Sequence, residues 1–371
     1  LGSLIILVLG FKELGGWDEM MRVCGAVTVN DYGDTMTNLI RSNDDANFPW
    51  LGALIGSAII GFWYWCTDQF IVQRVLSGKN EMEARRGTIF GAYLKLLPVF
   101  LFLIPGMIAF ALHQKYIGAG GEGFLPMLAN GTANADAAFP TLVAKLLPAG
   151  VKGLVVCGIL AALMSSLASL FNSSAMLFTI DFYKRFRPET PEKKLVGIGQ
   201  VATVVIVILG ILWIPIMRSV GDVLYTYLQD VQSVLAPGIA AAFLLGICWK
   251  RTSAQGGMWG LIAGMVIGLT RLGAKVYYSN AGEVADSTFK YLFYDMNWLF
   301  FCGWMFLFCI IVVIVVSLAT KAPTAEKIQG LVFGTATKEQ KAATRASWNH
   351  WDIIHTVIIL AITGAFYWYF W

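Results

Sequence analysis

The sequence predicts an all-α, polytopic membrane helix bundle, and three observations support that prediction. Of the 371 residues, 57% are hydrophobic and 13% are charged, about half the charged share of a soluble domain. Glycine is abundant, as is common where membrane helices pack closely. Apolar runs of a length that crosses a bilayer recur between charged segments. A soluble domain is thereby excluded, and a net charge of +4 without a long basic run indicates no nucleic-acid partner.

Eight complete apolar runs follow an opening apolar stub, Leu1 to Gly10. They are 17 to 30 residues long, and a helix needs about 20 residues to span the hydrocarbon. The runs are Trp50 to Val72, Gly87 to Leu112, Val151 to Ile180, Leu195 to Met217, Val223 to Trp249, Gly257 to Gly273, Trp298 to Leu318 and Ile353 to Trp371. The stub has no initiator methionine, basic leader or cleavage site, so we expect a fragment that begins within a helix.

Basic residues are distributed unequally between alternate loops. Loops 73–86, 181–194, 250–255 and 320–351 hold 16 Lys or Arg, whereas the longer alternate loops 12–48, 113–150, 218–222 and 271–297 hold 9. The positive-inside rule assigns the first set to the cytoplasm. The last run ends in an aromatic cluster from Phe366 to Trp371, which is typical of a membrane interface. We expect a multi-pass protein of the plasma or inner membrane with its C-terminus outside.

Helix-breaking pairs and polar side chains lie within these apolar runs. Pro–Gly pairs occur at 105–106 and 237–238, and Lys95, Gln229 and Asp230 lie at depth. Backbone groups freed in hydrocarbon are costly unless they face protein, water or a ligand. Such features are typical of transporters, although each residue taken alone is also compatible with a purely structural role.

A polar stripe runs along one face of the Val151 to Ile180 segment. On a 3.6-residue period its members are Ala162, Ser165, Ser166, Ser169 and Ser173. Ser165 and Ser166 lie near the middle of the run, and two hydroxyls beside a carbonyl one turn earlier offer three oxygens to a hard monovalent cation such as sodium. The alternative is that the serines bond back to the carbonyl four residues earlier and allow close helix packing.

Four segments closely resemble core helices of the sodium/solute symporter family, in particular its sodium/glucose cotransporter type. ALMSSLASLFNSSAMLFTIDFYKR, at 162–185, resembles the eighth core helix. YWCTDQFIVQRVLSGKN, at 64–80, and AYLKLLPVFLFLIPGMIAF, at 92–110, are similar to the sixth and seventh. LQDVQSVLAPGIAAAFLLGICWKR, at 228–251, is similar to the tenth. The resemblance covers essentially the whole chain and is far more specific than a short pattern.

This resemblance implies a leucine-transporter-like fold, in which two inverted five-helix repeats meet at a central site. We then expect a single transmembrane domain, 1–371, in which 1–11 ends the fifth core helix. The second inverted repeat would be 50–249, followed by three extra helices in 257–371. The first repeat would be missing, so the fragment alone is not expected to transport.

The resemblance also implies a sodium site on the polar stripe. Ala162 through its carbonyl, and Ser165 and Ser166 through their hydroxyls, match the family's sodium ligands. Ala168 stands where some relatives have a threonine linked to a second sodium. This implies that one sodium ion is co-transported with each substrate molecule.

A sugar site is implied by four further positions. Tyr64, followed by Trp65 as in relatives, matches the aromatic residue that closes the site, and Lys95 and Gln229 match polar sugar-site positions. An aromatic plate with a few convergent polar groups suits a pyranose. Alternatively, Lys95 snorkels toward water, Gln229 joins helices, and the two aromatics only pack. Gly61 departs from the polar residue usual in the family, which leaves the preferred sugar open.

The predicted function is secondary active transport, in which inward sodium flow drives uptake of a glucose- or galactose-type monosaccharide by alternating access. Sodium, the sugar and the lipid bilayer are the expected partners. The alternatives are a sodium symporter for inositol, an amino acid, a carboxylate or a vitamin, and a sodium-linked sugar sensor that does not transport. An enzyme is not expected, because His113, His350 and His355 lack metal-ligand spacing or a nucleophile partner.

Overall fold

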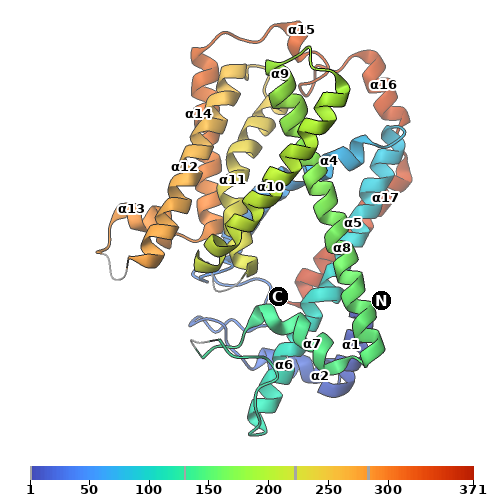
Figure 1. The fold of residues 1–371 in the computed structure, drawn as a ribbon, viewed down its shortest axis with the longest axis vertical. Coiled ribbons are helices and arrows are strands. Elements are labelled where there is room, and N and C mark those ends of the chain that lie inside the picture. The colour runs from blue at the N-terminus through green and yellow to red at the C-terminus, as the bar shows by residue number, and fades with distance from the viewer. Residues whose placement is uncertain (1, 129–130, 221–223, 282–284) are drawn as a thin grey trace. The chain divides into compact units, whose positions relative to one another are not determined.

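The computed structural model describes residues 2–128, 131–220, 224–281 and 285–371, and its long elements are all helices (Figure 1). Within these residues, seven helices are long and apolar enough to cross a membrane, or up to eight if one bent pair counts as a span. The predicted all-α polytopic membrane bundle is thereby confirmed. Leu1 and Val223, where two predicted segments begin, lie outside the described residues.

The spanning helices follow the predicted apolar runs with small shifts at their ends. Three of them consist of more than one segment: α3 (Trp50–Cys66) with α4 (Gln69–Leu76); α5 (Glu81–Pro98) with η1 (Val99–Leu103) and α6 (Ile104–Gly118); and α8 (Ala149–Met176) with η3 (Leu177–Tyr183) and α9 (Lys184–Phe186). The others are single helices: α10 (Glu192–Val220), α11 (Leu224–Cys248), α12 (Ala254–Asn280), α14 (Trp298–Ala319) and α17 (His350–Tyr369). The shorter helices are α1 (Gly2–Leu14), α2 (Trp17–Gly25), η2 (Ala135–Ala137), α7 (Ala138–Leu146), α13 (Thr288–Lys290), η4 (Tyr291–Asp295), α15 (Ala325–Ile328) and α16 (Lys338–Ala346).

The run predicted to continue to Val72 is broken into two helices that meet at an angle of 50°. Asp68 begins the second of them, because its carboxylate accepts a hydrogen bond from the backbone N–H of Phe70 at 3.1 Å. An aspartate at this position satisfies a backbone donor that the first turn of a helix leaves without a partner. Asp68 therefore caps α4 and does not simply end α3.

The proline at the end of α5 does not interrupt its helix. After Pro98 the chain passes through the π-helical segment η1 and continues directly into α6. In a π-helical turn, each backbone N–H bonds to the carbonyl five residues earlier instead of four, and single turns of this kind occur within long α-helices. Glu81–Gly118 consequently forms one continuous span of 38 residues.

The chain divides into two compact units, each of which is described by itself. The first unit contains Leu1–Leu39, Phe90–Ile216 and Thr363–Trp371. The second unit contains Ile40–Ile89 and Met217–Ile362. The division passes through α5, α10 and α17, so each of these helices contributes to both units.

Helices α11, α12 and α14 pack side by side in the second unit (Figure 1), and α3 packs against α11 and α14. Four buried glycines at four-residue spacing line α12: Gly256, Gly260, Gly264 and Gly268. A Cβ at Gly264 would lie 2.9 Å from the Cα of Gly238 on α11, and one at Gly268 would lie 2.6 Å from the carbonyl oxygen of Val234. Small residues are required where two membrane helices approach this closely.

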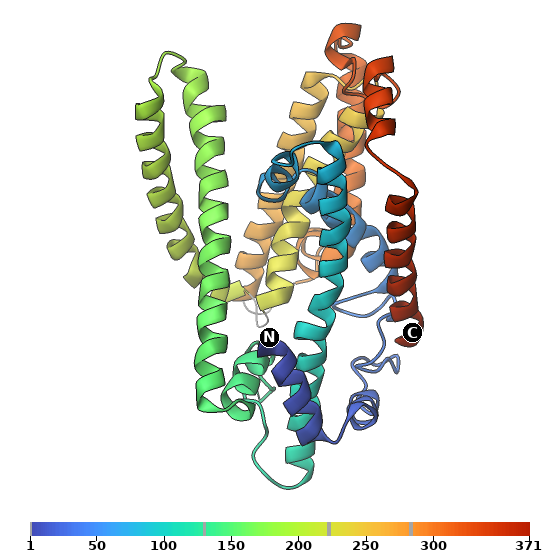
Figure 2. The same ribbon diagram turned by 90° about the vertical axis from the view of Figure 1, so that its right-hand side faces the viewer.

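The core of the first unit lies among α1, α2, α6 and α7. Its fully buried side chains include Ile6, Leu14, Ile108, Leu112 and Leu142. The aromatic end of α17 joins this unit, since the indole N–H of Trp17 donates to the Tyr369 hydroxyl at 2.9 Å. By contrast, α8 runs as one long green helix in Figure 2, and 6% of the most apolar stretch of its span is buried.

Candidate functional site

The polar stripe predicted on one face of α8 lies in the first unit, and its central residues are exposed. Ala162, Ser165 and Ser166 all have exposed side chains. Among the residues that the structure describes, neither of the two hydroxyls makes a hydrogen bond. Ser173, two turns further along, is 3% exposed and donates to the carbonyl oxygen of Ser169 at 2.8 Å. The back-bonding alternative therefore applies to Ser173, whereas the hydroxyls of the central pair remain available to a ligand.

One exposed helix face can supply only part of a cation site. The Ala162 carbonyl and the Ser165 and Ser166 hydroxyls would provide three oxygens, while hard cations in proteins commonly take six or more. The remaining oxygens must come from water, substrate or another segment. Within the described ranges, no cluster of three or more His, Cys, Asp or Glu side chains is placed to hold a metal ion.

Two of the predicted sugar-site residues lie on helices that pack together in the second unit. Tyr64 is on α3 and Gln229 is on α11. The Tyr64 ring is half-buried and meets the Trp65 ring edge-on, with centroids 5.2 Å apart, while Trp65 is 46% exposed. Two perpendicular aromatic rings near the end of a span can line a cavity for an amphipathic ligand.

Gln229 carries its amide on the half-buried face of α11. Its Nε2 donates to the phenol oxygen of Tyr225 at 3.2 Å, one turn earlier on the same helix. Tyr225 is 58% exposed and was not predicted as a site residue. The four-residue spacing of the two side chains was the available signal, since residues at this distance are neighbours on a helix surface.

Lys95 lies on the part of α5 that belongs to the first unit, as do the candidate sodium ligands. Its side chain is exposed. The structure thus brings the helices of Tyr64 and Gln229 together, and it places Lys95, Ala162, Ser165 and Ser166 in the other unit. Each set is described within its own unit.

An ion cluster around the buried Arg271 lies beside Gln229, and it was not predicted from the sequence. The Asp230 carboxylate is 3.3 Å from Nη2 of Arg271 and 2.5 Å from Nζ of Lys275. Arg271 is fully buried, and the same Nη2 donates to the carbonyl of Met296 at 2.8 Å. Its guanidinium carbon lies 4.0 Å from the centroid of the Phe301 ring. A charge buried in a membrane bundle requires such partners.

The cluster explains why α12 extends beyond its predicted end. From the sequence, this span was predicted to end at Gly273, and Arg271 and Lys275 were assigned to the outer loop 271–297. Both lie within α12, which continues to Asn280. Their spacing of four residues on one helix, with an aspartate in the preceding span, is the signal that could have indicated a paired cluster.

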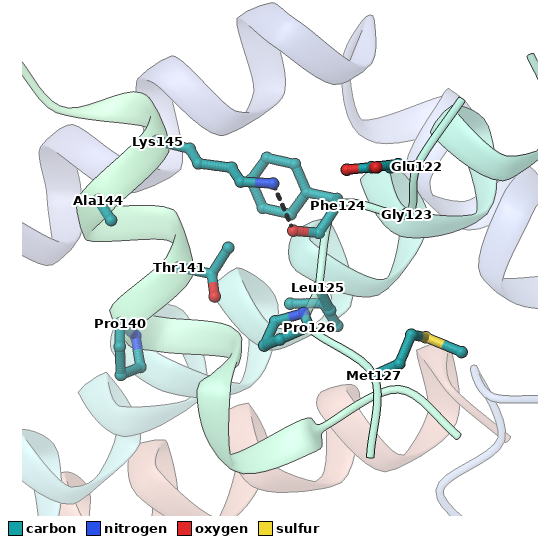
Figure 3. Close-up of a pocket in the computed structure, with 10 residues that line it drawn as sticks. All are labelled: Glu122, Gly123, Phe124, Leu125, Pro126, Met127, Pro140, Thr141, Ala144 and Lys145. Atoms are coloured by element: carbon teal, nitrogen blue, oxygen red, sulfur yellow. Dashed lines mark hydrogen bonds between the residues drawn. The ribbon is translucent and has the colours of Figure 1, made fainter. Parts of the chain in front are cut away.

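A cavity in the first unit lies away from the predicted site residues. Its volume is about 730 Å³, and it is lined by residues 122–127 and by Pro140, Thr141, Ala144 and Lys145 (Figure 3). The Lys145 ammonium donates to the Phe124 carbonyl at 2.8 Å and lies 4.7 Å from the centroid of that ring. Phe124 is 3% exposed. Because its ring is already covered, it offers no plate for a sugar.

His113 has a structural partner near this cavity. Its side chain is 3% exposed, and its Nδ1 accepts a hydrogen bond from the backbone N–H of Leu125 at 3.0 Å. The contact joins α6 to the loop that lines the cavity. This bond accounts for the buried imidazole without any reaction chemistry.

Comparison with known proteins finds one matching family and several similar relatives. A family model described as the sodium:solute symporter family matches residues 1–264. The chain is 34% identical over 390 residues to the sodium/mannose cotransporter SLC5A10 of Bos taurus, covering 100% of this chain and 65% of that protein. It is 37% identical over 336 residues to the sodium/glucose cotransporter 1 of Sus scrofa, covering 86% of this chain and 51% of that protein.

A third relative has a different solute in its name. The chain is 34% identical over 346 residues to the sodium/myo-inositol cotransporter 2 of Homo sapiens, covering 90% of this chain and 51% of that protein. The chain therefore spans between about half and two thirds of the length of these relatives.

Proposed function

The chain belongs to the sodium:solute symporter family, and from that premise we propose that the protein couples inward sodium flow to uptake of a monosaccharide. The observation that carries this proposal is the exposed hydroxyl pair, Ser165 and Ser166, in the middle of a membrane-spanning helix. Polar groups at membrane depth are disfavoured unless they face a polar partner. A co-transported sodium ion, held also by the Ala162 carbonyl, is such a partner.

The sugar is held in this proposal by Tyr64, Trp65, Lys95 and Gln229. Tyr64 and Trp65 supply aromatic surface for the apolar C–H faces of a pyranose. The Gln229 amide and the Lys95 ammonium supply polar contacts to its hydroxyl rim. Tyr225, whose hydroxyl accepts from the Gln229 amide, joins this set because a sugar hydroxyl can replace either partner in that hydrogen bond.

Sodium coupling is energetically sufficient for nutrient uptake. One sodium ion moving through ~100 mV gains about 2.3 kcal/mol. A tenfold concentration gradient adds about 1.4 kcal/mol, so the two together support roughly 500-fold accumulation. Transport of this kind requires alternating access and no covalent chemistry, so we do not assign an enzymatic activity.

We propose that the basic loops face the cytoplasm and that the C-terminus lies outside. Moving Arg271 and Lys275 from an outer loop into α12 strengthens the asymmetry of basic residues on which this orientation rests. In the same proposal, residues 50–249 form the second inverted repeat, 1–11 end the preceding core helix, and 257–371 add three helices.

A second candidate substrate is myo-inositol. The relative whose name carries that solute is as similar to this chain as the one whose name carries mannose, at 34% identity. Gly61 also lacks a polar side chain where the family commonly has one, which removes one hexose contact. Both solutes are polyols, so the same aromatic and amide groups would recognise either.

The decisive experiment measures uptake of labelled glucose, mannose and myo-inositol by the full-length protein in proteoliposomes. An inward sodium gradient is compared with an equal potassium gradient. Concentrative uptake of a hexose with sodium alone supports the proposal, and uptake of myo-inositol alone selects the second candidate. Sodium-dependent binding without accumulation would instead indicate a sensor and would contradict transport.

A further inference from the structure

The Asp230 cluster fixes the N-terminal half of α11 against α12. Arg271 holds one side of the carboxylate and is itself anchored by the Met296 carbonyl and the Phe301 ring. Lys275 holds the other side from one turn further along α12. Two cations share one carboxylate, so the cluster has a net positive charge and does not suit a cation as an additional ligand. Its evident effect is to join two helices through a buried directional contact.

A proline makes this contact important for the direction of α11. Pro237 lies inside the helix and has no N–H, so the carbonyl of Ser233 loses its usual partner within the helix. On the N-terminal side of Pro237, the Ser233 hydroxyl donates to the backbone carbonyl of Asp230 at 2.6 Å and adds a local hydrogen bond. Helices bend readily at such a position. The segment before Pro237 thus needs a lateral contact to fix its direction.

Close backbone approaches to α12 lie on both sides of Pro237. A Cβ on Gly264 would lie 2.9 Å from the Cα of Gly238, and one on Gly268 would lie 2.6 Å from the carbonyl oxygen of Val234. These contacts hold the two helices together without any charged group. The Asp230 cluster adds a charged, directional contact, and it does so only in the N-terminal half of α11, which carries Gln229.

We propose that Asp230, Arg271 and Lys275 are positioning residues that set the rotation of α11 and so direct the Gln229 amide toward the solute. Neighbouring residues on a helix point about 100° apart, so fixing Asp230 toward α12 fixes where Gln229 points. The role in solute recognition rests on the proposed function. The effect on the orientation of residue 229 does not, and can be measured separately.

The first experiment measures the orientation of residue 229 by thiol modification. Exposed Cys66, Cys157 and Cys248 are replaced by serine in the full-length protein, and Gln229→Cys is introduced. The rate of reaction with a water-soluble methanethiosulfonate reagent is compared between this protein and the same protein carrying Asp230→Asn. The expected result is a several-fold change of rate, because Asp230→Asn leaves two cations facing each other and releases the segment.

The matched control places the cysteine after Pro237 on the same helix. Cys248, the last residue of α11, is exposed beside the loop that follows the span, so the control restores this native cysteine in the protein with native Gln229. Its rate is expected to be the same with Asp230 and with Asp230→Asn. Where Asp230→Asn fails to fold, Lys275→Met carries the test, since it removes the more exposed cation and leaves the Asp230–Arg271 pair. An unchanged rate at residue 229 in a folded variant overturns the proposal.

The second experiment separates positioning from stability through transport kinetics, with native Gln229. Asp230→Asn is expected to raise the solute KM roughly tenfold, equivalent to the loss of one hydrogen bond, while sodium activation stays unchanged. Asp230→Glu keeps the carboxylate and is expected to restore the KM. A fall in maximal rate at constant KM would contradict positioning. If the unmodified protein transports none of the three solutes, the proposed function fails, while the thiol rates still decide whether Asp230 orients residue 229.

Discussion

Helices α8 and α12 both cross the membrane, but the polar side chains in the middle of α8 are exposed, whereas the charged side chains of α12 are paired. Of the most apolar stretch of the α12 span, 28% is buried. The span from α8 to α9 is more apolar, and 6% of its most apolar stretch is buried. In α12 the charged side chains have partners within the second unit. In α8 the central hydroxyls are exposed in a helix that packs little within the described structure.

The comparison shows that apolar character and packing are separate properties of a membrane helix. Lipid is as apolar as leucine, so a helix gains little by burying leucine against a neighbour. Close packing instead depends on small residues and paired polar groups, and α12 has both. The central hydroxyls of α8 are exposed and make no such close contact among the described residues.

The largest expected effect on stability follows from widening the contact between α12 and α11. Gly268→Ala would place a Cβ 2.6 Å from the backbone oxygen of Val234, which cannot move without shifting α11. Overpacking of this kind costs about 1–3 kcal/mol. Gly273→Ala on the same helix is the control, because no atom lies within 4 Å of its added Cβ. Thermal unfolding in detergent should separate the two variants, and equal melting temperatures would contradict the close approach.

A smaller effect is expected at the beginning of α12. The Ser253 hydroxyl accepts from the backbone N–H of Gly256 at 2.9 Å and caps the helix. The backbone N–H of Ser253 donates to the buried Ser317 hydroxyl on α14 at 3.1 Å. Ser253→Ala should reduce the free energy of unfolding by about 1 kcal/mol, whereas Ser253→Thr keeps the hydroxyl and should retain the cap. Chemical unfolding monitored by tryptophan fluorescence measures both, and an equal loss in the two variants would argue against capping.

Cysteine reactivity tests the burial assigned to the first unit without a mutation. Burial raises the pKa of the Cys24 thiol to about 11, so its reactive thiolate is scarce near neutral pH. Cys66, the last residue of α3, is exposed. At pH 7.5, a permeant maleimide should label Cys66 while leaving Cys24 unlabelled until the protein is unfolded. Peptide mass spectrometry distinguishes the two sites, and labelling of Cys24 in the folded protein would contradict the packing of α2 on α6.

Much of the fold could be predicted because apolar length and loop charge are properties of the local sequence. The break before Asp68 was harder to predict, since one aspartate near a span end suits both a solvated end and a helix cap. The extension of α12 could not be found locally, because the partner that neutralises Arg271 lies 41 residues earlier in the chain. Charged residues at the end of an apolar run are therefore assigned to a loop until the ion-pair partner is known.

The candidate site shows the same division between local and distant information. The stripe on α8 was visible from periodicity, but spacing alone could not distinguish Ser173, which bonds back to its own helix, from Ser165 and Ser166. The ring pair Tyr64 and Trp65 was likewise visible as a sequence feature. The contact between Gln229 and Tyr225 required knowledge of the rotamers.

The most direct test of the account replaces Ser165 and Ser166 together by alanine in the full-length protein and measures both unfolding and sodium-dependent uptake. Ser173→Ala is the matched control from the same stripe. The double variant is expected to unfold within about 0.5 kcal/mol of the unmodified protein, as exposed sites do, yet to lose its response to sodium. Ser173→Ala should keep that response. Unchanged sodium dependence in the folded double variant would contradict the account.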